Sequence, residues 1–390
     1  MVIANEQTQN TIFTYTKWTG IPVYGGKIAT IWALILFILL CCLEAAAIWK
    51  LIRILSGVAV YSSASRSLVA RLSGTIFYAN SLISLVLTWR FIAAWDDLSQ
   101  HWLKNELLSG LNTAKDKYIK RKIIFVTTFV SVCAIVEHIF SMMAAIGFHC
   151  GSLEGCLRTY ILISHGFVLQ SYEYNLWFAI PIFILSKLAT ILWNLQDLAI
   201  ILMSMGIVSR YSMLNLYTKK LIQCEYQKKL NYNKLSYQHI DQWRKLRRSY
   251  ARQAKLVRLL EKHLGPLVLL SNLNNLYFIC LQLYLGIRIM SRSWISRTYY
   301  LLSLTWLSSR ACGVVLAAAA IILYSKKALP DLRSCSSATY NIEVKRLITQ
   351  LTYDNVGLSG MKLFFLSRQS LLEVVATVIK YELILLQYDK

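Results

Sequence analysis

The sequence predicts an all-α membrane protein with seven transmembrane helices, a cytoplasmic N-terminus and an extracellular C-terminus. Three observations lead to this prediction. The 390-residue chain is 56% hydrophobic and has a mean hydropathy of +0.47, which is too apolar for an ordinary soluble protein of this size. Seven stretches approach or exceed the roughly 20 mostly apolar residues that a bilayer-spanning helix needs. The positive charges are concentrated in alternate loops, as they are in membrane proteins.

The predicted spans follow one another along the whole chain. They cover residues 27–49, 72–95, 123–148, 173–208, 264–287, 298–324 and 364–388. The first three are the most evenly apolar, and the fourth is long enough to tilt or to project beyond the membrane. Arg368, Glu373, Lys380 and Glu382 interrupt the last span, which is therefore the least regular. Only four prolines occur in the chain, so the spans can form unbroken helices.

The loop charges predict the orientation. Lys and Arg number 28 in the N-terminal tail up to Lys27 and in loops 96–122, 209–263 and 325–363, against eight in loops 50–71, 149–172 and 288–297. Positive loops stay in the cytoplasm, so the N-terminus lies inside and the C-terminus outside. The formal net charge of +23 is therefore interpreted as a topology signal, and a nucleic-acid partner is not expected.

The longest hydrophilic stretch, 209–263, is predicted to be helical. Apolar residues recur in it at steps of three and four, and it contains no proline. We expect two helices that continue the fourth and fifth spans into the cytoplasm, with a break around Leu230–Lys234. Two interpretations remain open: a solvated basic hairpin beside anionic lipid headgroups, or a surface on which subunits assemble.

Catalytic and metal-binding motifs are missing from the sequence. There is no H-E-x-x-H, no G-x-S-x-G and no phosphate-binding glycine loop, so neither an enzyme nor a cofactor is expected. The nine cysteines show no metal-site spacing. Cys150 and Cys156, in HCGSLEGC, fall in a predicted extracellular loop, where they form either a disulfide or two free thiols.

Polar residues within the spans are the candidate binding site. Charged groups are costly in a bilayer and face protein or water, so they are functional candidates. The candidates are Glu137, His138, Asn194, Asp197, Gln282, Trp306 and Arg310. Carboxylates, amides and aromatic faces suit a neutral polyol, whose hydroxyls need hydrogen-bond partners and whose C–H faces need flat surfaces. The alternative is that these groups pair with one another between helices, as we expect of Asn272, Asn274 and Asn275.

Several segments resemble the insect gustatory receptors, and within them the sugar-receptor branch. That family ends its last helix with Thr-Tyr, five mostly hydrophobic residues and Gln-Phe, and residues 380–388 read KYELILLQY here. Four more stretches share the resemblance: WNLQDLAIILMSMGIVSR (193–210), GPLVLLSNLNNLYFICLQLY (265–284), YNIEVKRLITQL (340–351) and GLSGMKLFFLSR (357–368). The resemblance covers most of the chain from about Tyr78 onward.

The resemblance implies a tetrameric, ligand-gated, non-selective cation channel in the plasma membrane of a sensory neuron's dendrite. Four copies of the last helix would line the pore, with Leu383, Ile384, Gln387 and Tyr388 at its constriction. Each subunit would bind a mono- or disaccharide in an outward pocket among the first six helices, surrounded by lipid, in a homo- or heterotetramer with related subunits.

The predicted spans and the resemblance together divide the chain into six regions. They are a cytoplasmic tail (1–26), helices one to four with the pocket region (27–208), a cytoplasmic helical anchor (209–263), helices five and six (264–324), a second anchor segment (325–363) and the pore helix (364–390).

The chain departs from the family signature at two positions. Lys380 replaces the threonine, and Tyr388 replaces the phenylalanine. A lysine that faced a cation path would raise its electrostatic barrier, so we expect Lys380 to point away from the lumen. The alternative function is a seven-helix receptor without a pore that signals through a cytoplasmic partner at 209–263.

Overall fold

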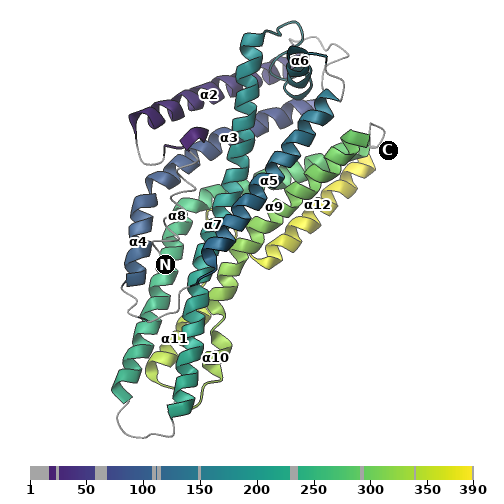
Figure 1. Cartoon of the computed structure of the whole chain (residues 1–390). Coiled ribbons are helices and arrows are strands. Elements are labelled where there is room, and N and C mark those ends of the chain that lie inside the picture. Colours follow the sequence, from purple (N-terminus) through teal and green to yellow (C-terminus); the bar gives the residue numbers. More distant parts are fainter. Residues whose placement is uncertain are drawn as a thin grey trace.

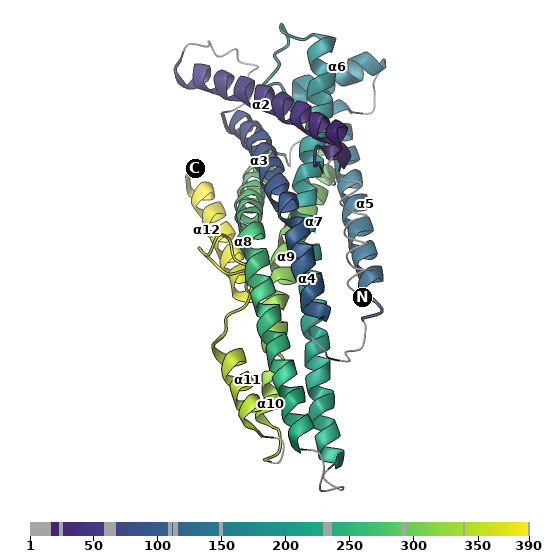
Figure 2. The same ribbon diagram turned by 90° about the vertical axis from the view of Figure 1, so that its left-hand side faces the viewer.

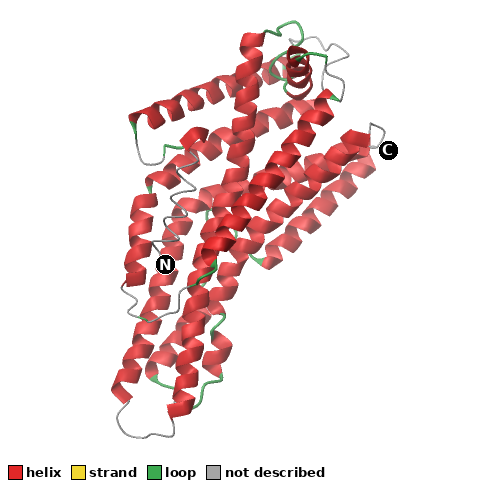
Figure 3. Ribbon diagram, viewed as in Figure 1, coloured by secondary structure: helices red, strands yellow, loops and turns green. Residues whose placement is uncertain are grey.

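The computed structural model describes residues 17–22, 26–57, 68–107, 111, 116–147, 151–228, 236–289, 294–337 and 340–388. Within these ranges the regular structure is helical, and an isolated antiparallel bridge joins Ser359 to Phe365 (Figure 3). The predicted all-α class is confirmed.

The elements follow the chain in a simple order (Figure 1). The first half contains a short 3₁₀ helix, η1 (Lys17–Thr19), and helices α2 (Lys27–Leu55), α3 (Leu68–Ala93), α4 (Trp95–Leu107), α5 (Ile119–Ile146) and α6 (Leu153–Ser164). The second half contains α7 (Leu176–Lys228), α8 (Ser236–Ile289), α9 (Trp294–Lys326), α10 (Leu329–Arg333), α11 (Ile342–Tyr353) and α12 (Arg368–Tyr388).

Six of the described helices are long and apolar enough to cross a membrane. They are α2, α3, α5, α7, α8 and α9, and they match the first six predicted spans in order. The outward faces of α2 and α5 carry exposed apolar side chains such as Ile38, Phe125 and Phe129, which suits contact with lipid. The chain is therefore a multi-pass membrane protein.

The seventh predicted span is helical but begins later than expected, at Arg368 instead of residue 364. The preceding residues form a turn in which Gly360 N donates to Phe364 O at 3.0 Å. Met361 and Lys362 have φ angles of 54° and 64° in this turn, a left-handed conformation that ends any helix. The apolar pattern of this segment does not reveal the turn.

The fourth and fifth spans continue as long helices, as predicted. α7 covers Leu176–Lys228 and α8 covers Ser236–Ile289, and the expected break around Leu230–Lys234 lies outside the described residues. Together they project beyond the other membrane helices at the lower end of Figures 1 and 2, where α10 and α11 pack beside them. Trp243, Leu246 and Tyr250 of α8 are completely or almost completely buried in this region, so the basic stretch has a genuine core.

Four shorter helices lie in segments that the sequence analysis left as loops: α4, α6, α10 and α11. Each is too short to span a bilayer, so a search for membrane-length apolar runs misses it. α4 buries Trp95, Leu98 and Trp102, which are spaced by three and four residues on one face. α11 begins after Asn341, whose side-chain oxygen accepts hydrogen bonds from the backbone N–H groups of Glu343 and Val344 at 2.9 and 3.1 Å.

Candidate functional site

A cavity of about 350 Å³ lies between the membrane helices, mainly α5, α7, α8 and α9. Its walls are formed by Phe77, Glu137, His138, Ser141, Tyr160, Ser164, His165, Ser186, Thr190, Trp193, Asn194, Phe278, Leu281, Gln282, Leu285, Tyr299, Tyr300, Ser303, Trp306, Leu307 and Arg310. The volume is at the lower end of the roughly 300–1,000 Å³ typical of small-molecule sites. Aromatic rings and a few polar groups share the walls, as in such sites.

The structure brings the predicted ligand residues together. Six of the seven line this cavity: Glu137, His138, Asn194, Gln282, Trp306 and Arg310. Asp197 does not line it and lies one layer behind, against Arg310. Whether any of them contacts a ligand stays a prediction.

Arg310 is the centre of a buried polar network. Its Nε lies 2.7 Å from Oδ2 of Asp197, and both side chains are almost completely buried. Its Nη1 donates to Oδ1 of Asn194 at 2.6 Å, and its guanidinium carbon lies 4.5 Å from the ring centre of Trp193. The network fixes one wall of the cavity and neutralises the arginine charge within it.

Asp197 has further hydrogen-bond donors on α8. Oγ of Ser271 donates to its Oδ1 at 2.5 Å, and Nδ2 of Asn275 donates to its Oδ2 at 3.3 Å. The prediction that Asn275 forms hydrogen bonds between helices is confirmed. For the other two asparagines the prediction is wrong: Asn272 donates to Val268 O within α8, and the side-chain atoms of Asn274 have no hydrogen-bond partner among the described residues. The aspartate thus joins α7, α8 and α9, which gives it a positioning role beside the cavity.

A second chain of hydrogen bonds crosses the cavity wall from α8 to α5. Nε2 of Gln282 donates to Oγ of Ser303 at 2.8 Å, and Ser303 donates to Oε1 of Glu137 at 2.9 Å. Ser303 links two predicted ligand residues, although sequence reasoning did not find it. A lone serine in a membrane helix carries no recognisable signal, because its hydroxyl usually bonds to its own helix.

Some polar atoms on the cavity wall have no hydrogen-bond partner among the described residues, and two of them carry the argument here. These two are Oε1 of Gln282 and Nε2 of His138. A buried polar atom without a partner is destabilising, so such atoms indicate where a ligand or water binds. They are the groups best placed to bond to hydroxyl groups of a guest molecule.

Aromatic side chains that the sequence analysis did not select complete the walls. Trp193 packs against Phe278 with ring centres 4.8 Å apart. Lys187, behind the wall, donates to Oη of Tyr160 at 3.0 Å. Tyr299 and Tyr300 also line the cavity. Tyrosine is frequent at membrane interfaces, so its presence near helix ends did not indicate a site.

The predicted pore and disulfide residues lie partly outside the described part of the chain. Leu383, Ile384, Gln387 and Tyr388 belong to α12, but their side chains are not among those described. Cys156 is disulfide-bonded, whereas Cys150 is outside the described residues, so their pairing stays a prediction.

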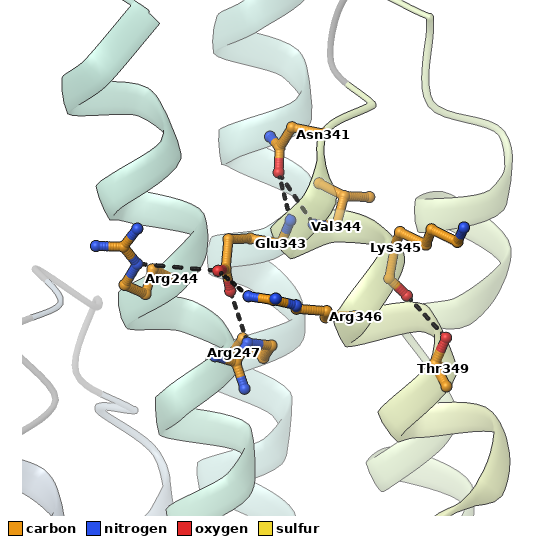
Figure 4. Close-up of polar contacts among 8 residues, drawn as sticks. All are labelled: Arg244, Arg247, Asn341, Glu343, Val344, Lys345, Arg346 and Thr349. Carbon is orange, nitrogen blue, oxygen red and sulfur yellow. Dashed lines mark hydrogen bonds and ion pairs between the residues drawn. The ribbon is translucent and has the colours of Figure 1, made fainter.

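A buried carboxylate joins α11 to α8, away from the cavity-lining residues (Figure 4). Glu343 of α11 is only 3% exposed and faces Arg247 of α8, with Nε to Oε2 at 2.7 Å. Arg346 and Arg244 lie 3.0 and 3.9 Å from its Oε1. Burial by itself would raise the pKa of Glu343, but the hydrogen bond and charge of Arg247, helped by Arg346, hold the pKa below its usual value.

Comparisons with known proteins place this sequence in a family. Residues 30–390 match a family model described as "Trehalose receptor". The chain is 28% identical over 319 residues to the gustatory receptor for sugar taste 64a of Drosophila melanogaster, covering 79% of this chain and 67% of that protein. It is 27% identical over 312 residues to gustatory receptor 5a for trehalose of the same species, covering 78% and 67%. The chain spans about two thirds of the length of these relatives.

Solved structures show the same fold. The insect olfactory receptor OR5 from Machilis hrabei superimposes with a TM-score of 0.74 at 12% identity, and the match covers 99% of both chains. The structure of that receptor in complex with eugenol superimposes with a TM-score of 0.70 at 11% identity, covering 98% of this chain and 97% of the other. At this level of identity the likeness concerns the fold alone.

Proposed function

The chain belongs to the trehalose receptor family, and from this premise we propose that it is a sugar-gated cation-channel subunit that acts as a taste receptor. It would work in the plasma membrane of a sensory neuron, as part of a tetramer with copies of itself or with related subunits. The observation that carries the proposal is the cavity, which combines unpartnered polar atoms with aromatic walls between the membrane helices.

The charges around the cavity favour a neutral ligand. Arg310 is paired with Asp197, and Glu137 accepts a hydrogen bond from Ser303. Lys187 provides the second positive charge next to the wall, against Tyr160. The two cations and the two carboxylates carry no net charge together, so the wall offers a charged ligand no net electrostatic attraction. A saccharide suits such a site because it offers hydroxyl groups and C–H faces without a net charge.

The contact between the cavity and α12 supports a path from ligand to pore. Leu307 lines the cavity and belongs to a hydrophobic cluster with Ile279 of α8 and Val378 of α12; Val374 packs against the same cluster. A ligand that shifts α9 relative to α8 would therefore move the surface on which α12 rests. For a two-state gate, about 5.5 kcal/mol of differential affinity changes the ratio of closed to open from 99:1 to 1:99, and four sites can share it.

The outer face of α12 supports assembly around this helix. Leu372, Val375 and Ile379 are exposed, and their spacing places them on one stripe. The stripe faces away from the rest of the chain, since Val374 and Val378 pack inward. If four copies surround a central axis, these stripes would contact one another and line the pore.

The decisive experiment expresses the chain by itself and records whole-cell currents during perfusion with monosaccharides and disaccharides. We expect a saturable, sugar-dependent cation current. Saccharide binding to the purified protein without any current, both when the chain is expressed alone and when it is co-expressed with a related subunit, would contradict the channel and favour a receptor that acts through a cytoplasmic partner. The absence of both binding and current would contradict the sugar ligand.

A second set of variants tests the pore. Gln387→Ala and Tyr388→Ala should change leak, rectification or ion selectivity, whereas Trp177→Ala, at an 84% exposed surface position, should change none of these. If both α12 variants conduct like the unmodified protein, the constriction lies elsewhere.

A further inference from the structure

Gly286 of α8 and Tyr300 of α9 meet at the cavity wall. Gly286 is buried one helical turn after Gln282, and Tyr300 itself lines the cavity. A methyl group at position 286 would lie 2.0 Å from Oη of Tyr300, 2.3 Å from its Cζ and 2.9 Å from its Cε2. The phenol end of the tyrosine thus occupies the space that any side chain at position 286 would need.

Helix formation does not explain a glycine at this position. Glycine is a poor helix former, and inside a helix it usually has a packing reason. The positive φ angles recorded for glycines in the described part of the chain belong to Gly20, Gly57 and Gly147, so the backbone at Gly286 would accept an L-residue. The missing side chain therefore serves the neighbouring ring.

The ring transmits a change at position 286 to the cavity. The clashing atoms are at the far end of a side chain that can rotate, so a larger residue would displace the ring instead of the helix. Protein interiors are closely packed, and the empty space that adjoins this ring is the cavity. In a cavity of about 350 Å³, a displaced phenol removes a substantial part of the room for a ligand.

We propose that the space left by the missing side chain of Gly286, called the notch below, holds the ring of Tyr300 in place. The position of this ring then sets the largest saccharide that the cavity admits. The proposal rests on the proposed function, because it assumes a saccharide ligand. It adds a pair of specificity-determining residues, one of which makes no ligand contact. A smaller notch selects smaller sugars, and a smaller residue at position 300 admits larger ones.

The test compares glucose with trehalose and maltose, which each contain two glucose units. Binding to the purified full-length chain is measured by calorimetry, and half-maximal sugar concentrations are measured from currents. Gly286→Ala should weaken the response to the disaccharides about 10-fold or more relative to glucose, since one added methyl group in a tight pocket has effects of this size. Tyr300→Ala should shift the ratio in the opposite direction.

The chain offers a matched control and a double variant. Gly313→Ala adds the same methyl group to α9, where it would meet only Cδ1 of Ile201 at an ordinary 3.7 Å. It should leave the ratio unchanged. In the Tyr300→Ala background, Gly286→Ala should have little further effect, because the ring that transmits the clash is gone.

The outcomes separate the two proposals. If the unmodified chain binds neither glucose nor a disaccharide, the proposed function fails and the saccharide class fails with it. If the unmodified chain binds sugars but Gly286→Ala and Tyr300→Ala leave the ratio of disaccharide to glucose affinity unchanged, only the notch is wrong. An equal effect of Gly286→Ala with and without the Tyr300 ring would also contradict it.

Discussion

At the scale of single residues, the cavity wall separates into groups that are already bonded and groups that are open. Arg310, on the wall, is paired with Asp197, which lies behind it. Gln282 uses its amide N–H on Ser303 but leaves its carbonyl oxygen without a partner in the described structure. Mutation should therefore affect the two kinds of residue differently. Changes in the Arg310–Asp197 pair should lower the stability of the fold, whereas changes in the Gln282 amide should lower the affinity for the ligand.

Gln282 is expected to affect sugar affinity directly. Gln282→Met keeps the length of the side chain and removes the free carbonyl oxygen. Because one hydrogen bond contributes about 1 kcal/mol, the half-maximal sugar concentration should rise roughly fivefold. Dose–response currents measure this shift, with the maximal current as an internal reference. Asn272→Leu is the control, because that amide bonds within its own helix. An unchanged affinity in Gln282→Met would show that the open oxygen does not bind the ligand.

Asp197 is expected to act on stability first. Asp197→Asn leaves Arg310 buried without its counter-charge, which typically costs about 3–5 kcal/mol. The thermal stability and surface amount of the variant should fall, as measured by size-exclusion chromatography of heated samples and by surface labelling. Asp197→Leu combined with Arg310→Met removes both charges and should fold better than the single variant. Full stability of Asp197→Asn would contradict this positioning role.

At the scale of elements, α8 connects the two ends of the molecule. Its 54 residues make it roughly 80 Å long. Near the start of α8, Arg247 forms an ion pair with Glu343 of α11. Further along α8, Arg258 pairs with Asp354 at the C-terminal end of α11. Gln282, near its other end, lines the cavity. One helix therefore contacts the ligand region and the segment that leads into α12.

The Glu343 cluster is expected to stabilise the docking of α11 on α8. Glu343→Gln removes the charge that Arg247 and Arg346 bind, and hydrogen bonds to charged groups contribute about 1.5–3 kcal/mol each. The melting temperature of the purified protein should fall by several degrees. The control is Asp241→Asn, because Asp241 pairs with Lys245 at the surface, where such pairs contribute little. Equal melting temperatures for the two variants would exclude a special role for Glu343.

The same cluster predicts a pH dependence with a definite sign. The folded-state pKa of Glu343 is lower than its usual value of 4.5, so the ionised form favours the folded state. Its contribution is complete above pH 4.5 and is lost as the pH falls through the folded-state pKa. Melting curves of the unmodified protein between pH 6 and pH 3 should converge on those of Glu343→Gln at the acid end. A constant difference across this range would contradict the assignment.

At the scale of the whole molecule, the loop charges and the arrangement of the helices predict how the protein is oriented in the membrane. The end that carries α6 also carries the C-terminal end of α12, whereas the basic hairpin of α7 and α8 projects from the opposite end (Figures 1 and 2). The loop charges place the hairpin in the cytoplasm. The end of the molecule that carries α6 then faces the outside of the cell.

Thiol labelling in cells tests this orientation. Leu153, in α6, is 88% exposed, and Tyr353, at the end of α11, is 81% exposed. Leu153→Cys should react with a membrane-impermeant maleimide in intact cells, and Tyr353→Cys should react only after permeabilisation. The unmodified protein supplies the background of the native cysteines. The reverse pattern would invert the proposed topology.

The sequence by itself determined the class, the spans and the family of this protein. Long apolar runs can be satisfied only by membrane helices, because the backbone must bond internally in lipid. The apolar periodicity of 209–263 also predicted that α7 and α8 continue beyond the membrane-spanning runs. The rarity of polar groups in membrane spans also identified six residues that line the cavity.

Only the tertiary structure decided how these residues are used. It placed Asp197 behind Arg310, inserted Ser303 between Gln282 and Glu137, and seated Tyr300 against Gly286. It also showed the left-handed turn before α12 and the short helices in the loops. The contacts of the cavity join residues distant in the chain, and a serine, glycine or tyrosine has no local pattern that shows which neighbour it will meet. Composition and periodicity describe one helix at a time, whereas a binding site is formed where several helices pack together.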